Sequence, residues 1–289
     1  MMTDGDGPGP VLQRRRVRTE LRKARLETGL TQEQVADAMD WSLSKVIRIE
    51  NGSVAISTND LKALLRLYKP IDAERTDELI ALARASRERS WWSGGAYREV
   101  ASPALRQLIG YESAASIARS FETLLVPGLL QTEEYARTII TEFEGPGHLD
   151  TLVEIRMRRQ DLLDRADPPL LFFILDEAVV RRQIGGKAVM RRQIRSLAEA
   201  ADRPNVTIEV VPFGAGAHPG LKGPFVVIEF PDPEDDDVLY LENPQGDLVG
   251  RDYPEEVLAH REAFEVLRDL SLGPEGSRDY LAKLADEKA

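Results

Sequence analysis

The sequence predicts an α+β protein, with an all-α N-terminal region and a C-terminal α+β region that contains a small mixed sheet. Three features lead to this prediction. Apolar residues recur at helical spacing through most of the chain as far as Asp167, and strand-like apolar runs begin only after it. Between the two regions, the segment 90–95 (SWWSGG) has the glycines of a joint.

The chain accordingly divides into four segments. Residues 1–12 are rich in Gly, Pro and Asp and are expected to form a disordered tail. Residues 13–90 are expected to fold as a helical domain, and residues 91–103 as a linker. Residues 104–286 are expected to form the second, α+β domain.

The stretch from Leu30 to Gly52 predicts two short helices joined by a tight turn. Thr31 can cap the first helix, which runs from about Gln32 to Met39, and Gln34 completes a capping-box pattern. The turn contains Asp40 where glycine would be easiest, and Asp tolerates a positive φ angle better than most residues do. The arrangement is that of a helix-turn-helix DNA reader.

The second short helix carries Val46 and Ile49 on one apolar stripe, with Ile47 expected to pack at its flank. Its other side chains point outward, as those of a recognition helix do in the major groove. Arg or Lys can donate to guanine, and Ser can pair with either base. At the start of the first helix, Gln32 is expected to hold a phosphate rather than to read sequence. The expected DNA contacts are Thr31, Gln32, Ser42, Leu43, Ser44, Lys45, Arg48 and Asn51.

The net charge of −11 argues by itself against a nucleic-acid partner, but the charge is unevenly distributed. Residues 1–90 contain 16 Lys/Arg and 14 Asp/Glu, a net of +2, and the segment 11–70 alone has a net of +5. Residues 91–289 contain 22 Lys/Arg and 35 Asp/Glu, a net of −13. The basic excess therefore coincides with the predicted DNA reader, whereas DNA would repel the rest of the chain.

Beyond the joint, the pattern predicts helices that give way to strands. Helices are expected at about residues 104–118, 132–143, 150–165, 176–183, 189–201, 254–270 and 277–286. Strands are expected at about residues 170–175, 207–211, 225–230, 238–241 and 248–249, and the segment 121–126 could also be extended.

Composition excludes several classes of protein. The chain has no cysteine, so disulfides and thiol chemistry are excluded, and its three histidines have no metal-ligand spacing. No apolar run is long enough to span a membrane, and the N-terminus lacks the pattern of a signal peptide. We therefore expect a cytoplasmic protein without a metal or cofactor.

Four acids near the predicted strand ends are the candidates for acid/base or metal chemistry: Asp176, Glu177, Glu229 and Glu242. Their spacing specifies no metal site, and Glu177 can instead favour the start of its own helix through the helix dipole. We expect no catalytic residues and no enzyme activity.

Two further features of the second domain allow more than one interpretation. A glycine-rich loop surrounds His218; it is either a turn or a lid over a ligand or partner. Arg156, Arg158 and Arg159 form a dense cationic helix face, which either pairs with local acids or contacts an acidic partner protein.

The segment around the two short helices resembles the xenobiotic-response-element type of helix-turn-helix domain, shared with the lambda-repressor group. Thr31-Gln32, Val35-Ala36, Arg48-Ile49-Glu50 and Asn51-Gly52 carry the resemblance. It implies a five-helix bundle, whose other helices would be residues 14–28, 58–68 and 72 to about 89. Four arginines at positions 14–18 could then contact phosphates or enter a minor groove as an arm; alternatively, they are a solubilising helix start.

Residues from about Ala104 to Leu284 resemble the domain of unknown function found in antitoxin-like transcriptional regulators of actinomycetes. The phrases that carry the resemblance are VPGLLQTEEYA (126–136), RMRRQDLL (156–163), LDEAVVRRQIGG (175–186), NVTIEVVPFGAGAHPGLKGPFVVIEF (205–230) and VLYLEN (238–243). The resemblance implies a transcriptional regulator that binds double-stranded DNA and is often encoded beside a small partner protein.

We therefore expect a sequence-specific regulator whose second domain dimerises and binds a small partner protein or ligand. A single reading module buries little surface, so tight binding is expected to need a homodimer on a two-fold site. The alternative is an antitoxin-type protein that neutralises a small partner and binds DNA for autoregulation.

Overall fold

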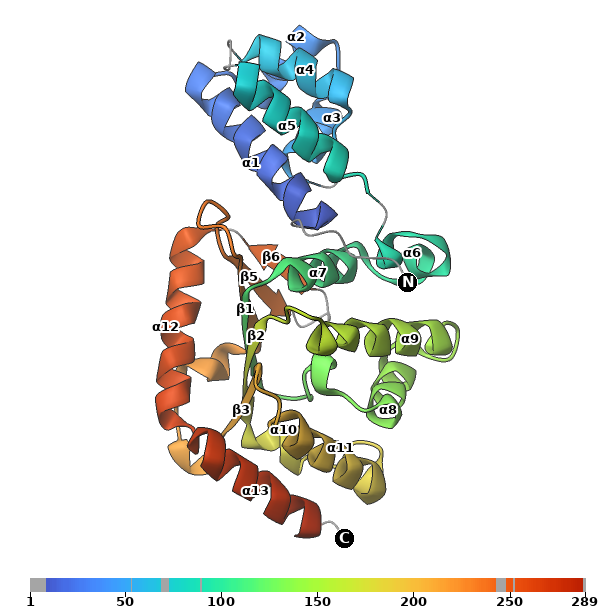
Figure 1. Cartoon of the computed structure of the whole chain (residues 1–289), viewed down its shortest axis with the longest axis vertical. Coiled ribbons are helices and arrows are strands. Elements are labelled where there is room, and N and C mark those ends of the chain that lie inside the picture. The colour runs from blue at the N-terminus through green and yellow to red at the C-terminus, as the bar shows by residue number, and fades with distance from the viewer. Residues whose placement is uncertain are drawn as a thin grey trace. The chain divides into compact units, whose positions relative to one another are not determined.

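The computed structural model describes residues 9–52, 54–68, 73–88, 90–242, 248–251 and 253–287 (Figure 1). The chain divides into two compact units, Met1–Trp91 and Trp92–Ala289. Of the predicted tail, residues 1–8 lie outside the described part of the chain. The predicted fold class is confirmed, because the first unit is helical and the second combines helices with a mixed sheet.

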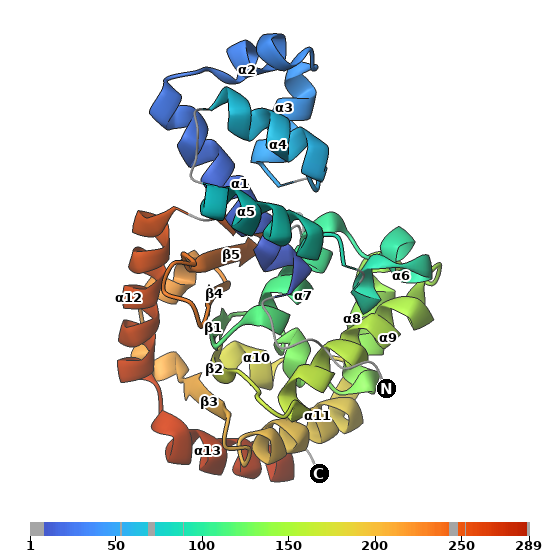
Figure 2. The same cartoon turned by 45° about the horizontal axis from the view of Figure 1, so that its top comes forward.

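The first unit contains five α-helices whose apolar faces meet in one core (Figure 2). Side-chain caps explain where several of them begin; for example, Ser57 Oγ accepts the Asp60 N–H at 2.9 Å. The core includes Leu21, Val35 and Leu61, which are almost completely buried. The helices are α1 (Pro10–Thr28), α2 (Gln32–Met39), α3 (Leu43–Glu50), α4 (Thr58–Leu67) and α5 (Ala73–Ala85).

Helix α1 begins earlier than the sequence pattern indicated, so the last residues of the predicted tail are helical. Pro10 suits the first position of a helix because it has no N–H to leave unpaired. Leu12, in this first turn, is fully buried. The arginines at positions 14–18 therefore lie within α1 and do not form a free arm, and Arg15 is buried.

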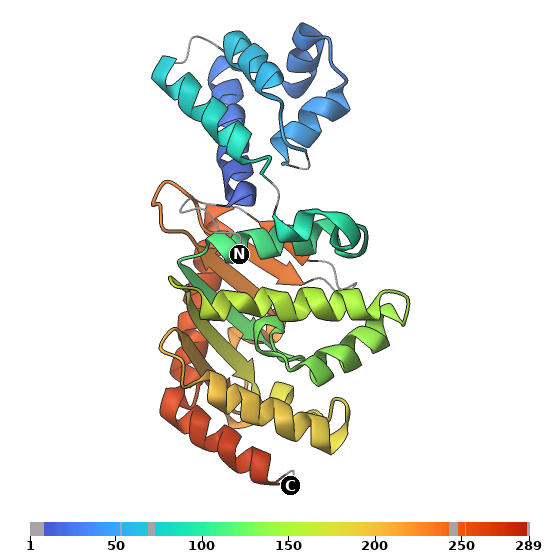
Figure 3. The same cartoon turned by 45° about the vertical axis from the view of Figure 1, so that its right-hand side comes forward.

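The second unit is a six-stranded mixed sheet with helices on both faces (Figure 3). The strand order is β3-β2-β1-β4-β5-β6; β1, β2 and β3 run parallel, and β4, β5 and β6 pair antiparallel. The strands are β1 (Ile117–Glu122), β2 (Leu170–Asp176), β3 (Val206–Val211), β4 (Phe225–Glu229), β5 (Val238–Glu242) and β6 (Leu248–Arg251).

The helices of the second unit cover the sheet unequally. Helix α12 lies on one face of the sheet, and the helices from α7 to α11 lie on the other (Figure 1). Phe121, Val227 and Phe264 are in the core between the sheet and α12. The helices are α6 (Gly95–Val100), α7 (Pro103–Ala114), α8 (Glu133–Glu144), α9 (Leu149–Arg159), α10 (Glu177–Arg181), α11 (Gly186–Ala200), α12 (Pro254–Leu270) and α13 (Gly273–Glu287).

On the outer edge of strand β3, both backbone groups of Val210 are bonded to Leu272 and to Ser277 in the first turns of α13. The Leu272 N–H donates to the Val210 carbonyl at 2.9 Å, and the Val210 N–H donates to Ser277 Oγ at 2.8 Å. These two bonds occupy backbone groups that an edge strand would otherwise offer to another chain.

Two segments differ from the sequence pattern. Residues 91–103 contain a 3₁₀ turn (Trp91–Ser93) and helix α6, where a plain linker was predicted. The predicted helix through residue 118 ends at Ala114, and Ile117–Glu122 is strand β1 rather than helix. Pairing with β2 on one side and β4 on the other outweighs the local helical spacing there.

In the part of the chain that the structure describes, no helix has both the length and the apolar character that a membrane span requires.

Candidate nucleic-acid interface

The start of α2 is fixed by a complete capping box, as the sequence predicted. The Gln34 N–H donates to Thr31 Oγ1 at 3.2 Å, and the Thr31 N–H donates to Gln34 Oε1 at 2.9 Å. The preceding helix ends at Gly29, whose φ of 72° is left-handed. Both reciprocal bonds leave Thr31 engaged within its own helix start.

The turn between α2 and α3 depends on Asp40. Its φ of 52° and ψ of 45° are left-handed, and among the described residues it is the one non-glycine position with a positive φ. The Trp41 N–H donates to the Ala36 carbonyl at 2.9 Å, which closes the turn. The short polar side chain of Asp makes this conformation affordable without a glycine.

The inner faces of α2 and α3 are buried in the core of the first unit. Val35 and Ala36 on α2, and Val46 and Ile49 on α3, have at most 5% of their surface exposed. The small Ala36 side chain allows the two helices to pack closely at the turn. This packing fixes the angle at which α3 presents its other face.

The outer face of α3 is exposed and mixes polar with apolar side chains. Ser44 and Arg48 lie one turn apart, and Arg48 Nε donates to the Ser44 carbonyl at 3.2 Å. Leu43 and Ile47 are 37% and 38% exposed beside them. The prediction that Ile47 packs at the flank of the core is therefore wrong, because Val46 and Ile49 already fill that face.

The other predicted contacts of α3 are partly committed to its own structure. Ser42 is the N-cap, and its Oγ accepts the Lys45 N–H at 3.3 Å. The Lys45 Nζ lies 3.2 Å from Asp60 Oδ2 and 3.5 Å from the centre of the Trp41 ring. Asn51 is the C-cap residue and donates its N–H to the Ile47 carbonyl at 2.9 Å.

A buried ion pair joins α1 to the end of α3, and the sequence pattern did not reveal it. Arg25 donates to both carboxylate oxygens of Glu50, at 2.6 and 3.0 Å, and to the Leu30 carbonyl at 2.8 Å. Gln32 Nε2 donates to Glu50 Oε2 at 2.8 Å. The hydrogen bond with Glu50 raises the pKa of Arg25, and burial followed by the Glu50 charge raises the pKa of Tyr68.

This network ties Gln32 to the buried pair. Its side-chain amide donates to Glu50, which connects the start of α2 to the end of α3. The available signal was a charged residue, Glu50, directly after Ile49 on the inner side of α3. A buried carboxylate requires a partner, but the sequence alone does not say that the partner is Arg25.

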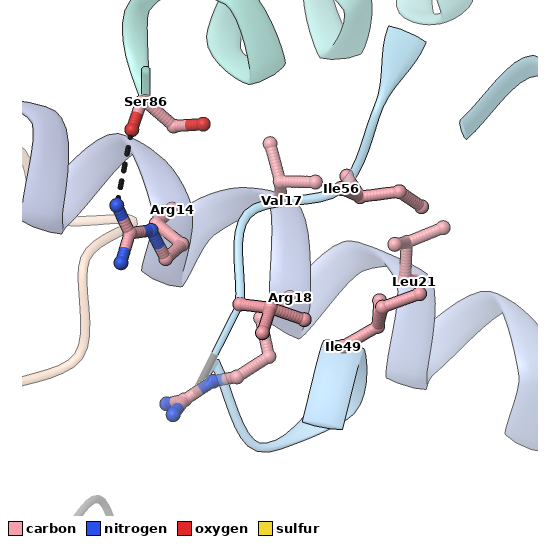
Figure 4. A pocket seen from close by; sticks show the side chains of 8 residues that line it. Arg14, Val17, Arg18, Leu21, Ile49, Ile56 and Ser86 are labelled. Atoms are coloured by element: carbon pink, nitrogen blue, oxygen red, sulfur yellow. Dashed lines mark hydrogen bonds between the residues drawn. The ribbon is translucent and has the colours of Figure 1, made fainter. Parts of the chain in front are cut away.

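A shallow depression lies between α1 and the end of α3 (Figure 4). Arg14 Nη2 donates to the Ser86 carbonyl at 3.3 Å, and Arg18 Nη1 donates to the Asn51 carbonyl at 3.4 Å. Both arginines therefore reach across from α1 to neighbouring segments of the same unit. Between them the lining is apolar, with Val17, Leu21, Ile49, Val54 and Ile56.

The cationic face of α9 in the second unit is used within that unit. Arg159 makes two bonds to Glu112, at 2.8 and 3.1 Å, and both side chains are buried. Arg156 Nη1 donates to Gln131 Oε1 at 2.8 Å. These contacts support the interpretation in which the face pairs with local groups.

The four acids considered for catalysis do not gather at one place among the described residues. Asp176 ends β2 and caps α10, whereas Glu229 ends the antiparallel strand β4 at the opposite end of the strands, beside the start of β1. The side chain of Glu242 lies outside the described residues. No group of three potential metal ligands occurs in the described part of the chain.

Glu177 is a buried structural acceptor. It accepts from the Phe213 N–H at 2.8 Å, the Tyr280 hydroxyl at 2.7 Å and Arg181 Nε at 3.0 Å. Burial raises the pKa of Glu177, but these three hydrogen bonds together lower it below the usual value. Burial and the bond to Glu177 raise the pKa of Tyr280 to about 12.

Comparisons with known families agree with this geometry. Residues 16–79 match a family described as a helix-turn-helix domain, which indicates a DNA-binding regulator. Residues 105–283, more than half of the chain, match a family described as a domain of unknown function (DUF5753). No curated protein and no solved structure matches the chain. The chain therefore belongs to the DUF5753 family and carries a helix-turn-helix domain ahead of the family's domain.

Proposed function

We propose that this protein is a sequence-specific transcriptional regulator of the xenobiotic-response-element, lambda-repressor-like type, and that α3 enters the major groove of its operator. The observation that carries the proposal is that α3 is buried on one side and exposed on the other. Val46 and Ile49 anchor the helix, while the face around Ser44 and Arg48 is open to solvent. A helix held in this way can present side chains to base edges without losing its own packing.

The outer face suggests a division of roles. Arg48 donates to guanine O6 or N7, with Ser44 beside it. Leu43 and Ile47 offer apolar atoms to a thymine methyl group. Four of the other predicted contacts hold the DNA backbone, through the N-terminal N–H groups of α2 and α3 and the loop after α3. They are Thr31, Gln32, Ser42 and Asn51.

Selection of bound duplexes from a random DNA pool, using the full chain, tests this proposal. A recurring sequence is expected, and Arg48→Ala should bind it about 5- to 150-fold more weakly and with relaxed preference at one base pair. Arg66→Ala, which removes an exposed arginine at the end of α4, is the matched control and should keep the preference. Equal weakening on all sequences would make Arg48 a phosphate contact, and selection of no recurring sequence would refute sequence-specific reading.

We also propose that the second unit supplies dimer contacts, so that two copies read a two-fold operator. The support is the small surface that one reading helix can bury. Sedimentation of the full chain with operators of one and two half-sites tests this. Full affinity for a single half-site by a monomer would contradict it.

Binding of a small partner protein, in a regulator or in an antitoxin-type protein, is favoured by the surface of the second unit. Leu124, Phe213 and Leu221 are 56–66% exposed. They follow or precede strand ends at the edge where β1 and β3 finish and β4 starts. Residues 91–289 have a net charge of −13, which suits a basic partner. Copurification of a small basic protein that releases operator DNA would support both functions in one chain.

We propose that the chain acts in the cytoplasm without a cofactor and is not an enzyme. The support is the engagement of its candidate acids in local bonds. Asp176 caps α10, and Glu177 anchors Phe213, Tyr280 and Arg181.

A further inference from the structure

Lys45 is held away from the centre of the outer face by two contacts. Its Nζ lies over the Trp41 ring, 3.5 Å from the centroid, and 3.2 Å from Asp60 Oδ2. Trp41 belongs to the turn before α3, and Asp60 to the first turn of α4. The two contacts therefore come from separate elements and fix one cation between them.

The rotation of α3 explains this placement. Successive helical residues are about 100° apart, so Ser44 and Arg48 mark the middle of the outer face when Val46 and Ile49 mark the inner one. Lys45 falls on the flank beside Ile49 and is only partly exposed. Arg48, by contrast, forms no ion pair with any described residue, and its side chain donates to the Ser44 carbonyl.

We infer that Trp41 and Asp60 position Lys45 on the flank of α3. We also infer that the ion pair between Lys45 and Asp60 lowers the affinity of the protein for DNA of unrelated sequence. The inference rests on the proposed function. Non-specific affinity comes from cations that displace counterions from phosphates. A lysine whose charge is already compensated by Asp60 adds little to that displacement, so Asp60 raises the ratio of specific to non-specific binding.

The effect is expected to be moderate. The Lys45 and Asp60 side chains are 34% and 32% exposed, so solvent screens the pair. One released lysine amounts to about one additional phosphate contact. That changes the salt slope by about 0.9 and raises affinity about 3- to 10-fold near 0.1 M salt.

A double-mutant cycle with the full chain tests the inference. The variants are Asp60→Asn, Lys45→Met and their combination, and Asp37→Asn is the matched control. Asp37 is an exposed acid on α2 whose change alters net charge by the same amount. Fluorescence anisotropy against a random-sequence duplex gives affinity and salt slope, and thermal unfolding verifies that each variant is folded.

Asp60→Asn is expected to bind the random duplex about 3- to 10-fold more tightly with a steeper salt slope, and Asp37→Asn to bind like the parent. Lys45→Met alone should change little, and in the Asp60→Asn background it should remove the gain. A gain that persists in the combined variant would show that Asp60 acts by its own charge and would overturn the inference. A flatter slope for Lys45→Met alone would also overturn it. If the parent binds no DNA, the proposed function fails instead.

Discussion

Each unit contains a buried ion pair in which an arginine donates two hydrogen bonds to a glutamate, but the two ion pairs connect different elements. In the first unit, Arg25 and Glu50 also engage Gln32, at the exposed start of α2. In the second, Arg159 and Glu112 join α9 to α7. The same chemistry thus positions a surface element in one unit and fastens two helices in the other.

The difference teaches where a buried pair matters for function. A buried ion pair is weak evidence for net stability, since desolvation offsets much of the attraction. Its geometry is nevertheless demanding, because two parallel bonds fix the orientation of both groups. In the first unit that orientation extends to the helix start that faces the proposed DNA backbone.

The largest effect is expected from breaking the first pair. Arg25→Met leaves Glu50 buried without its cation, and the free energy of unfolding of the first unit should fall by about 3–5 kcal/mol. Operator binding should fall with it, because α2 and α3 lose their common support. Urea unfolding followed by hydrogen exchange on peptides measures the loss and locates it in residues 9–88.

Arg159→Met is the matched control, since it breaks the equivalent pair in the second unit. We expect a similar loss of protection there, while protection of the first unit stays unchanged. Equal loss of protection in both units after either substitution would contradict the separation of the two networks.

A smaller effect is expected from substituting Glu177. This substitution removes a buried hydrogen-bond acceptor, whereas the two arginine substitutions each break a buried ion pair. Glu177→Gln should cost the second unit about 1–3 kcal/mol at pH 7. Because the pKa of Glu177 is lowered by folding, its contribution is present above the unfolded pKa of about 4.3 and is lost as the pH falls through the lower folded value. Thermal unfolding between pH 3 and pH 7 should therefore depend less on pH in the variant, and an unchanged pH dependence would contradict this role.

The smallest effect is expected on the outer face of α3. Replacing a contacted thymine by deoxyuridine removes one methyl group, worth about 0.8 kcal/mol or about 4-fold in affinity. Ile47→Ala should bind both operators equally, because the apolar partner of the methyl is gone. Anisotropy titrations compare the four combinations; if the base change weakens parent and variant equally, Ile47 does not read that methyl.

Local signals predicted the reading module well. The capping box at Thr31 and the left-handed Asp40 follow from side-chain chemistry within a few residues, and the structure confirms both. The five helices of the first unit agree with the bundle that the family resemblance implies, and the change from helices to strands after residue 167 was expected from apolar spacing. Such features depend on neighbours in sequence, which a single sequence displays directly.

Features set by distant partners could not be predicted in the same way. Ile117 and Ala118 continue a helical spacing, yet they begin strand β1 because β2 and β4 lie on either side. Arg25 and Glu50 are separated by 25 residues, and nothing in their local pattern relates one to the other. Lys45 and Asp60 lie 15 positions apart, and the sequence does not show that their side chains meet.

The closure of β3 has a consequence during synthesis. The strand leaves the ribosome about 60 residues before Leu272 and Ser277, the two residues that bond the outward backbone groups of Val210. At the usual elongation rate of about 5–20 residues per second, the nascent sheet keeps this flank unpaired for several seconds. A chain truncated after Leu270 would retain it permanently. Such fragments should associate through strand pairing, whereas in the full chain Leu272 and Ser277 withdraw Val210 from such pairing once α13 has been made.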